Sequence, residues 1–247
     1  MLMLLVAALA PVAILMYYVY HKDINPEPKN LVFKGFLYGV LATFVSTLVS
    51  GPLLRMGYFT LQPETIREAI KVSFLGAAIP EELAKLLMLW LLLRRNPHFD
   101  ERYDGIVYAV AVGLGFAAFE NLQYVIASGA DWMQVSFGRA LLAVPGHFSF
   151  AVVMGYYYSR YHFYGKQSDK VKILLYPVLL HGFYDSIVFS SNLGGGLSGL
   201  FTAVLLVFCF WLFSSTRKRI RSEAADNDNY NLIMRDSAPY DDQPDEQ

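Results

Sequence analysis

Long apolar runs alternate with short polar connections along most of the chain. Each run is close to the roughly 20 residues that a helix needs to cross a bilayer core of about 30 Å. A helix is favoured in lipid because it satisfies its own backbone hydrogen bonds. The pattern therefore predicts an all-α, polytopic membrane bundle of about seven transmembrane helices, approximately over residues 2–20, 32–54, 69–93, 104–128, 135–159, 171–191 and 196–215.

The composition supports this assignment. Of the 247 residues, 55% are hydrophobic and only 17% are charged, which is too apolar for a soluble domain of this length. The single cysteine, Cys209, lies inside the last apolar run, so the sequence holds neither a disulfide framework nor a zinc-finger spacing. The N-terminal run lacks a basic segment and a clear cleavage site, and we interpret it as a retained span.

The distribution of positive charge predicts the orientation. Fourteen Lys and Arg residues fall on the first, third and fifth connections and the start of the tail, against four (Arg55, Arg67, Lys71 and Arg139) on the other side. Because cytoplasmic connections carry the excess of Lys and Arg, we expect a multi-pass protein of the cell (inner) membrane with its N-terminus outside and its C-terminus in the cytoplasm.

The composition changes after Ser215, where the basic string 217–221 is followed by an acidic segment. Residues 222–247 contain eight acidic residues and one arginine with few apolar groups, which is typical of disorder. We therefore expect a transmembrane domain over residues 1–215, followed over 216–247 by a basic anchor and a disordered acidic cytoplasmic tail.

The third apolar run contains Glu81, Glu82 and Lys85 directly after Pro80. Inserting an ionisable group at the bilayer centre costs at least about 2.5–3.5 kcal/mol, so three such groups in one span indicate that they have a function. Glu81 and Lys85 lie one turn apart on a shared helix face, while Glu82 points about 100° away. Pro80 leaves the carbonyl of Gly76 unpaired, which is tolerated only inside protein or beside water. An internal Glu81–Lys85 ion pair is the alternative, but it leaves Glu82 without a role.

Three later runs also contain polar residues. Glu120 is followed by Asn121, His147 follows a Pro-Gly break, and His181 and Asp185 are one turn apart. Asp185 can accept from one ring nitrogen of His181, which leaves the other nitrogen for a metal or a proton. Glu120 and His147 could instead be buried hydrogen-bonding groups that rigidify the bundle. Glu81, His147 and His181 lie near the midplane of their spans, and Glu120 and Asp185 lie in the outer half. These compatible depths predict one polar, water-filled cavity that opens toward the outside.

Carboxylates, imidazoles and a buried lysine suit hydrolysis, which needs a base for water and groups that stabilise an oxyanion. The sequence has no H-E-x-x-H, which excludes a zincin-type site, and no G-x-G-D for an aspartyl dyad. A G-x-S-G string at Gly196–Gly199 lies at a span boundary with no histidine after it. The glycines of Gly113–Gly115 are better explained by helix packing than by a dinucleotide loop.

The motifs of these runs, in order, resemble the PrsW intramembrane proteases. They are E-E-x-x-K at Glu81–Lys85, F-x-x-x-E-N ending at Asn121, G-H at His147 and H-x-x-x-D at His181–Asp185, and the string D-I-N-P-E-P at Asp23–Pro28 is similar to that family too. The likeness covers about residues 15–215. The related CAAX prenyl proteases have E-E-x-x-x-R, F-x-x-x-H and H-x-x-x-N, from which Lys85, Glu120 and Asp185 depart.

The resemblance implies a peptidase that cuts a membrane-anchored protein, in the family's type member an anti-sigma factor cut on its extracytoplasmic side. The expected catalytic residues are the ionisable ones of the motifs, Glu81, Glu82, Lys85, Glu120, His181 and Asp185. The expected metal ligands are His147, His181 and Glu82, with zinc as the ion. Glu81 would be the general base, Lys85 would keep it ionised, and Asp185 would orient His181. The alternative is that the glutamates act without metal and the histidines polarise the scissile carbonyl.

We expect a single-span membrane protein as substrate, the lipid bilayer as surroundings and no nucleic-acid partner, and the oligomeric state is left open. A proton- or cation-coupled transporter is the main alternative, because midplane carboxylates and proline-broken helices also occur there. The chain lacks the inverted repeat that such folds contain. A non-enzymatic scaffold would leave the paired glutamates without a role.

Overall fold

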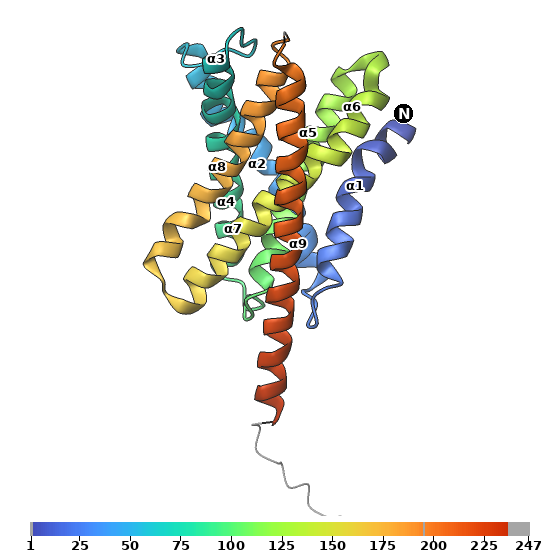
Figure 1. Ribbon diagram of the computed structural model, residues 1–247. Coiled ribbons are helices and arrows are strands. Elements are labelled where there is room, and N and C mark those ends of the chain that lie inside the picture. The colour runs from blue at the N-terminus through green and yellow to red at the C-terminus, as the bar shows by residue number, and fades with distance from the viewer. Residues whose placement is uncertain (1, 195, 237–247) are drawn as a thin grey trace, which may run out of the picture.

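The computed structural model describes residues 2–194 and 196–236, which are helical apart from short connections (Figure 1). The α-helices are α1 (Leu2–Tyr20), α2 (Lys29–Arg55), α3 (Ile66–Lys71), α4 (Ile79–Leu93), α5 (Asp104–Ala127), α6 (Trp132–Gly138), α7 (Val144–Tyr164), α8 (Gln167–Ser191) and α9 (Ser198–Asp236). Two π-helical segments, η1 (Val72–Ala78) and η3 (Arg139–Ala143), and a 3₁₀ turn, η2 (Gly129–Asp131), complete the described chain. The predicted all-α fold is confirmed.

Six helical stretches are long and apolar enough to cross a membrane: Met3–Tyr20, Lys29–Arg55, Asp104–Ala127, Gly129–Tyr164, Gln167–Ser191 and Ser198–Asp226. The third predicted span, residues 69–93, differs from these six. It forms a continuous rod of α3, η1 and α4, whose longest piece is the 15-residue α4. Glu81, Glu82 and Lys85 make the apolar part of this rod more highly charged than the other six stretches.

Helix α5 is the centre of the bundle, and 83% of the residues in its 18-residue apolar stretch are buried. Glycines allow α2 to lie directly against it. A Cβ on Gly39 would come within 2.0 Å of the carbonyl oxygen of Val112, and a Cβ on Gly115 within 2.0 Å of the carbonyl oxygen of Phe36. Only glycine permits this backbone contact at both positions.

The contact between α5 and α7 is equally close. A Cβ on Gly113 would lie 2.6 Å from that of Ala151, and a Cβ on Gly155 would lie 2.2 Å from the carbonyl oxygen of Gly105. The helix-packing role predicted for Gly113–Gly115 is therefore present, and it brings the polar residues of α5 and α7 within reach of each other.

The two π-helical segments stand immediately before the site-bearing helices α4 and α7. Each is followed by a proline in the first turn of the next helix, Pro80 or Pro145. The wider i→i+5 turn and the missing proline N–H leave carbonyls without an ordinary helical partner. Glu81 and His147 come directly after these breaks, so irregular backbone sets where both side chains enter the bundle.

The connections divide between the two ends of the bundle (Figure 1). The N-terminus, α3 and the α5–α6 connection lie at one end. The α1–α2, α4–α5 and α7–α8 connections lie at the other end, from which α9 extends beyond the other helices. These three are the connections that the positive-inside count assigns to the cytoplasm.

Helix α9 continues past Ser215, where the sequence analysis ends the last span, to Asp236. Ile220 is fully buried and Glu223 forms an ion pair with Arg102 of the α4–α5 connection. The chain has no Gly or Pro between Ser215 and Asp236, so a helix begun in the apolar span propagates at low cost. The sequence predicts disorder from Ser222, whereas the backbone is helical up to Asp236. Residues 237–247 lie outside the described part of the chain.

Candidate active site

Helices α4, α5, α7 and α8 bring the ionisable residues predicted from the sequence into one cluster. Its members are Glu81, Glu82 and Lys85 of α4, Glu120 of α5, His147 of α7, and His181 and Asp185 of α8. Each belongs to an unbroken chain of contacts of 3.4 Å or less. The glutamate pair thus faces both imidazoles and not lipid.

Lys85 is at the centre of this cluster. Its Nζ lies 2.8 Å from Oε1 of Glu82, 3.4 Å from Oε2 of Glu81 and 3.1 Å from Nδ1 of His147. The ammonium also lies 4.1 Å from the centre of the Phe116 ring. The i,i+3 and i,i+4 spacing within α4 explains why one lysine reaches both glutamates. A single buried cation therefore compensates two buried carboxylates.

His181 has a carboxylate at each ring nitrogen. Its Nδ1 lies 2.8 Å from Oε1 of Glu82, while its Nε2 lies 3.3 Å from Oδ2 of Asp185 and 3.9 Å from Oε2 of Glu81. The ring also stacks on Phe150, with centroids 4.9 Å apart and planes 20° apart. Sequence analysis expects Asp185 to orient His181. In the structure the shortest contact of this ring is with Glu82, which is 99 residues away on another helix, so helix periodicity cannot predict it.

The contacts of His147 define its neutral tautomer. Lys85 can only donate, so Nδ1 of His147 must accept, and the ring hydrogen is then on Nε2. Nε2 lies 2.9 Å from Oε2 of Glu120 and donates to it. The two imidazoles are close, with ring centroids 5.2 Å apart. His147 therefore links the α4 lysine to the α5 carboxylate.

Arg139 of η3 is a site residue that the sequence analysis counts only as a positive charge. Its Nη2 lies 2.7 Å from Oε2 of Glu120, its Nε lies 2.8 Å from Oδ1 of Asn121, and its guanidinium covers the Tyr124 ring at 4.1 Å. Asn121 in turn donates from Nδ2 to the carbonyl of Ala8 in α1 at 2.6 Å. The signal that could have identified Arg139 is its position as a lone arginine in an apolar run that follows an acid-bearing run.

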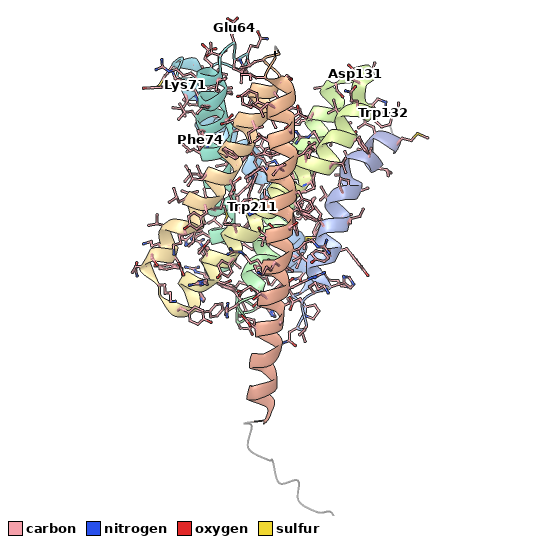
Figure 2. All side chains as sticks on the ribbon, viewed as in Figure 1. Glu64, Lys71, Phe74, Asp131, Trp132 and Trp211 are labelled. Carbon is pink, nitrogen blue, oxygen red and sulfur yellow. The ribbon has the colours of Figure 1, made fainter. Side chains whose placement is uncertain are left out.

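A cavity of about 640 Å³ adjoins the cluster. Its lining includes Glu81, Glu120, Arg139, His147, His181 and Asp185, but neither Glu82 nor Lys85. It reaches the exposed Asp131 and Gln134 of the η2–α6 segment. Asp131 lies at the end of the bundle where the N-terminus also lies (Figure 1 and Figure 2). Substrate-sized space is therefore continuous from an exposed end to the buried side chains.

Glu81, His147 and His181 each offer a ligand atom, and these atoms lie within 4.8 Å of one another. Ligand atoms of a tetrahedral zinc site, at about 2.0–2.1 Å from the ion, are about 3.3 Å apart. Two imidazoles and a carboxylate are the right donors, and small side-chain movements would bring them to that spacing. His147 would also have to exchange its tautomer, because its Nε2 carries a hydrogen while Lys85 holds Nδ1. Sequence analysis assigns Glu82 to the metal, whereas in the structure Glu81 is the glutamate beside both rings.

Comparison with known proteins identifies relatives. A family model described as "PrsW family intramembrane metalloprotease" matches residues 27–213. A protein named Protease PrsW from Clostridioides difficile (strain 630) is 36% identical over 191 residues, which cover 75% of this chain and 79% of that protein. A protein of the same name from Geobacillus kaustophilus (strain HTA426) is 35% identical over 82% of this chain and 87% of that protein. Another from Bacillus subtilis (strain 168) is 34% identical over 87% of this chain and 94% of that protein. No solved structure gives a significant match.

Proposed function

Because the chain belongs to the PrsW family of intramembrane metalloproteases, we propose that its cavity is the site at which a peptide bond of a membrane-anchored protein is hydrolysed. The protein is a peptidase of the membrane by its family, and the resemblance seen in the sequence motifs is confirmed. The observation that carries the site assignment is that the two adjacent glutamates lie at different positions relative to the cavity. Glu81 lines the cavity, whereas Glu82 is fully buried behind it.

Glu81 is proposed as the general base. It takes a proton from the attacking water while the water oxygen bonds to the carbonyl carbon, and it returns that proton to the departing amine nitrogen as the C–N bond breaks. The contact with Lys85 at 3.4 Å favours the ionised carboxylate. Glu82 accepts from Lys85 and from Nδ1 of His181, so it positions both groups without reaching the cavity.

The donors for the developing oxyanion come from the opposite wall. Nε2 of His147 donates toward Glu120, and Arg139 contacts the same carboxylate. Fixed donors in a dry site stabilise charge that forms in the transition state, because they need no reorganisation. A substrate carbonyl that enters between His147 and His181 would meet both imidazoles, whose centroids are 5.2 Å apart.

Zinc, when bound, would be held by His147 and His181 together with a carboxylate, and it would supply a Lewis acid and an activated water at this position. Metal content measured on purified Glu81→Gln decides between two roles for this glutamate. We expect the variant to keep the metal of the wild type and to lose cleavage, as a base does. Loss of metal with loss of cleavage would make Glu81 a ligand instead.

The substrate class is proposed from the family resemblance, and the position of the cavity opening supports it. We propose a single-span regulatory membrane protein, such as an anti-sigma factor, that is cut near the extracytoplasmic side. The cavity reaches Asp131 and Gln134 at the end assigned to the outside by the positive-inside count. Proteomics of the membrane fraction from a deletion strain, complemented with wild type or Glu81→Gln, is expected to reveal a single-span protein that accumulates only with the variant.

Cleavage in proteoliposomes tests the assignment directly. With the accumulating protein as substrate, Glu81→Gln and His181→Ala are expected to reduce kcat by at least about 100-fold, as removal of an essential catalytic group does. Glu64→Gln is the matched control, because it makes the same change at an exposed position outside the cavity. Unaltered turnover in folded Glu81→Gln and His181→Ala would refute the proposed site.

A further inference from the structure

A second group of carboxylates lies at the other end of the bundle from the cavity opening. Asp23 and Glu27 belong to the α1–α2 connection, Asp100 and Glu101 to the α4–α5 connection, and Asp104 is the first residue of α5. Both connections lie at the end from which α9 extends (Figure 1). The proposed proteolysis makes no use of these five acids.

The carboxylates converge although they are far apart in the sequence. Ligand oxygens of Asp23, Glu101 and Asp104 lie within 4.8 Å of one another, and so do those of Glu27, Asp100 and Asp104. Asp104 belongs to both sets and is only 1% exposed, and Asp23 is 7% exposed. The two sets therefore form one group around Asp104, and we call these five residues the acidic cluster.

Two buried oxygens of this cluster have no hydrogen-bond partner in the part of the chain that the structure describes: Oδ1 of Asp104 and Oδ2 of Asp23. The other oxygen of each carboxylate is used. Oδ2 of Asp104 accepts from the backbone N–H groups of Asp100 and Glu101 at 3.1 and 2.6 Å, and Oδ1 of Asp23 accepts from that of Asn25 at 3.2 Å. Backbone groups thus fix both carboxylates and leave one oxygen of each unsatisfied.

Among the described residues, Asp23, Glu27 and Asp104 form no ion pair with Lys or Arg. Buried carboxylates are normally paired or coordinate metal, so this group needs either a cation or protons.

We propose that the acidic cluster binds one hard divalent cation, Ca²⁺ or Mg²⁺, through carboxylate oxygens of Glu27, Asp100 and Asp104, which lie within 4.8 Å of one another. A set of oxygen donors without histidine or cysteine selects these ions over zinc. Two hydrogen bonds already fix the position of Glu27. The hydroxyl of Tyr108 donates to its Oε2, and the hydroxyl of Tyr20 donates to its backbone carbonyl at 2.9 Å.

The cation would tie the α1–α2 connection to the start of α5. The two connections are also joined by a hydrogen bond from Nδ2 of exposed Asn25 to Oε1 of Glu101 at 2.7 Å. Because α5 carries Glu120 and is the central helix, an ion at its first residue stabilises the part of the bundle on which the active site depends. The site is separate from the proposed catalytic site and does not depend on that assignment.

Thermal unfolding of the full chain in neutral-lipid nanodiscs tests this proposal. The protein is first treated with EDTA and then titrated with CaCl₂ or MgCl₂ at constant ionic strength, and bound ions are counted by equilibrium dialysis. We expect the melting temperature to rise with cation concentration and one ion to bind per chain, because a ligand that binds only the folded state stabilises it. Asp104→Asn and Glu27→Gln are each expected to weaken binding by at least about tenfold.

Matched controls separate this site from others. Glu64→Gln changes an exposed glutamate at the other end of the bundle (Figure 2) and should keep the full rise in melting temperature. His181→Ala should also keep it, since the active-site imidazole is not a ligand here. EDTA-treated Asp104→Asn should be at least as stable as the wild type, because one buried like charge is gone.

The proposal is overturned if the wild type shows no cation-dependent rise and binds no ion, which would mean that the carboxylates share protons instead. It is equally overturned if the rise persists unchanged in Asp104→Asn and Glu27→Gln, or disappears in His181→Ala alone. The wild-type titration decides even if a variant fails to fold.

Discussion

At the scale of single residues, the site is governed by one cation between buried acids. Lys85 contacts Glu81, Glu82 and His147 and is itself only 3% exposed. Removing one partner from a buried ion pair leaves an uncompensated charge, whereas replacing both partners by neutral groups can cost little. The network should therefore respond differently to single and double substitutions.

Lys85→Met is expected to lower the free energy of unfolding by about 3–5 kcal/mol, the cost of an unpaired buried charge. Adding Glu82→Gln should recover much of this loss, because the most buried carboxylate is then neutral. Denaturant unfolding in detergent, followed by tryptophan fluorescence, measures both variants. A double variant that is less stable than Lys85→Met would contradict this account of the cluster.

Arg139 acts through Glu120 and His147 in the proposed mechanism, so it is a positioning residue. Arg139→Gln is expected to lower kcat by about 10- to 100-fold, as loss of an outer partner does, with a smaller change in KM. Arg139→Lys should restore part of kcat, since a cation again faces Oε2 of Glu120. Equal kcat in wild type and Arg139→Gln would show that this contact is only structural.

At the scale of elements, close helix contact at glycines decides how the proposed catalytic residues meet. Helix α2 touches the backbone of α5 at Gly39, and α7 touches it at Gly155. Helix α5 then presents Glu120 to His147 of α7 at 2.9 Å. The π-helical segments η1 and η3 have a related effect, since they set the register of the helices that follow them.

Gly39→Ala tests this contact against a control in the same helix. The added Cβ would lie 2.0 Å from the carbonyl oxygen of Val112, so α2 and α5 must separate, at a cost of about 1–3 kcal/mol or more. Gly51→Ala meets nothing within 4 Å and is expected to be neutral or stabilising by about 0.5–1 kcal/mol through helix propensity. Equal melting temperatures for the two variants would show that α2 is free to shift.

At the scale of the whole molecule, the cavity and the acidic cluster lie at opposite ends of the bundle. The cavity reaches one end through Asp131 and Gln134, and the acidic cluster occupies the other. Most Lys and Arg residues outside the spans lie at the end with the acidic cluster, which the positive-inside rule assigns to the cytoplasm. The proposed cut near the outside depends on this orientation.

Cysteine labelling in intact cells measures the orientation. The chain has one cysteine, so Cys209→Ser provides a cysteine-free background for Glu64→Cys and Lys166→Cys, which place a thiol at exposed positions of opposite ends. A membrane-impermeant maleimide should label the first variant in intact cells and the second only after lysis. The reverse result would place the cavity opening in the cytoplasm and rule out an extracytoplasmic cut.

The sequence by itself determined the class of fold and the set of candidate residues. Apolar runs of membrane length leave a helix as the favoured structure, and the cost of charge in lipid marks Glu81, Glu82, Lys85 and Glu120 as residues with a task. Ordered motifs of these residues also sufficed to identify the family. Local periodicity correctly placed Lys85 within reach of Glu81, because both lie on the same helix.

Only the tertiary structure decided how residues of different helices pair. Periodicity gives neighbours within one helix but neither the rotation of that helix about its axis nor its partners. It therefore could not show that Glu82 turns inward to His181, that Arg139 contacts Glu120, or that Glu27 meets Asp104. Those pairings depend on close packing at glycines and on irregular turns, where contacts between distant segments outweigh local preference.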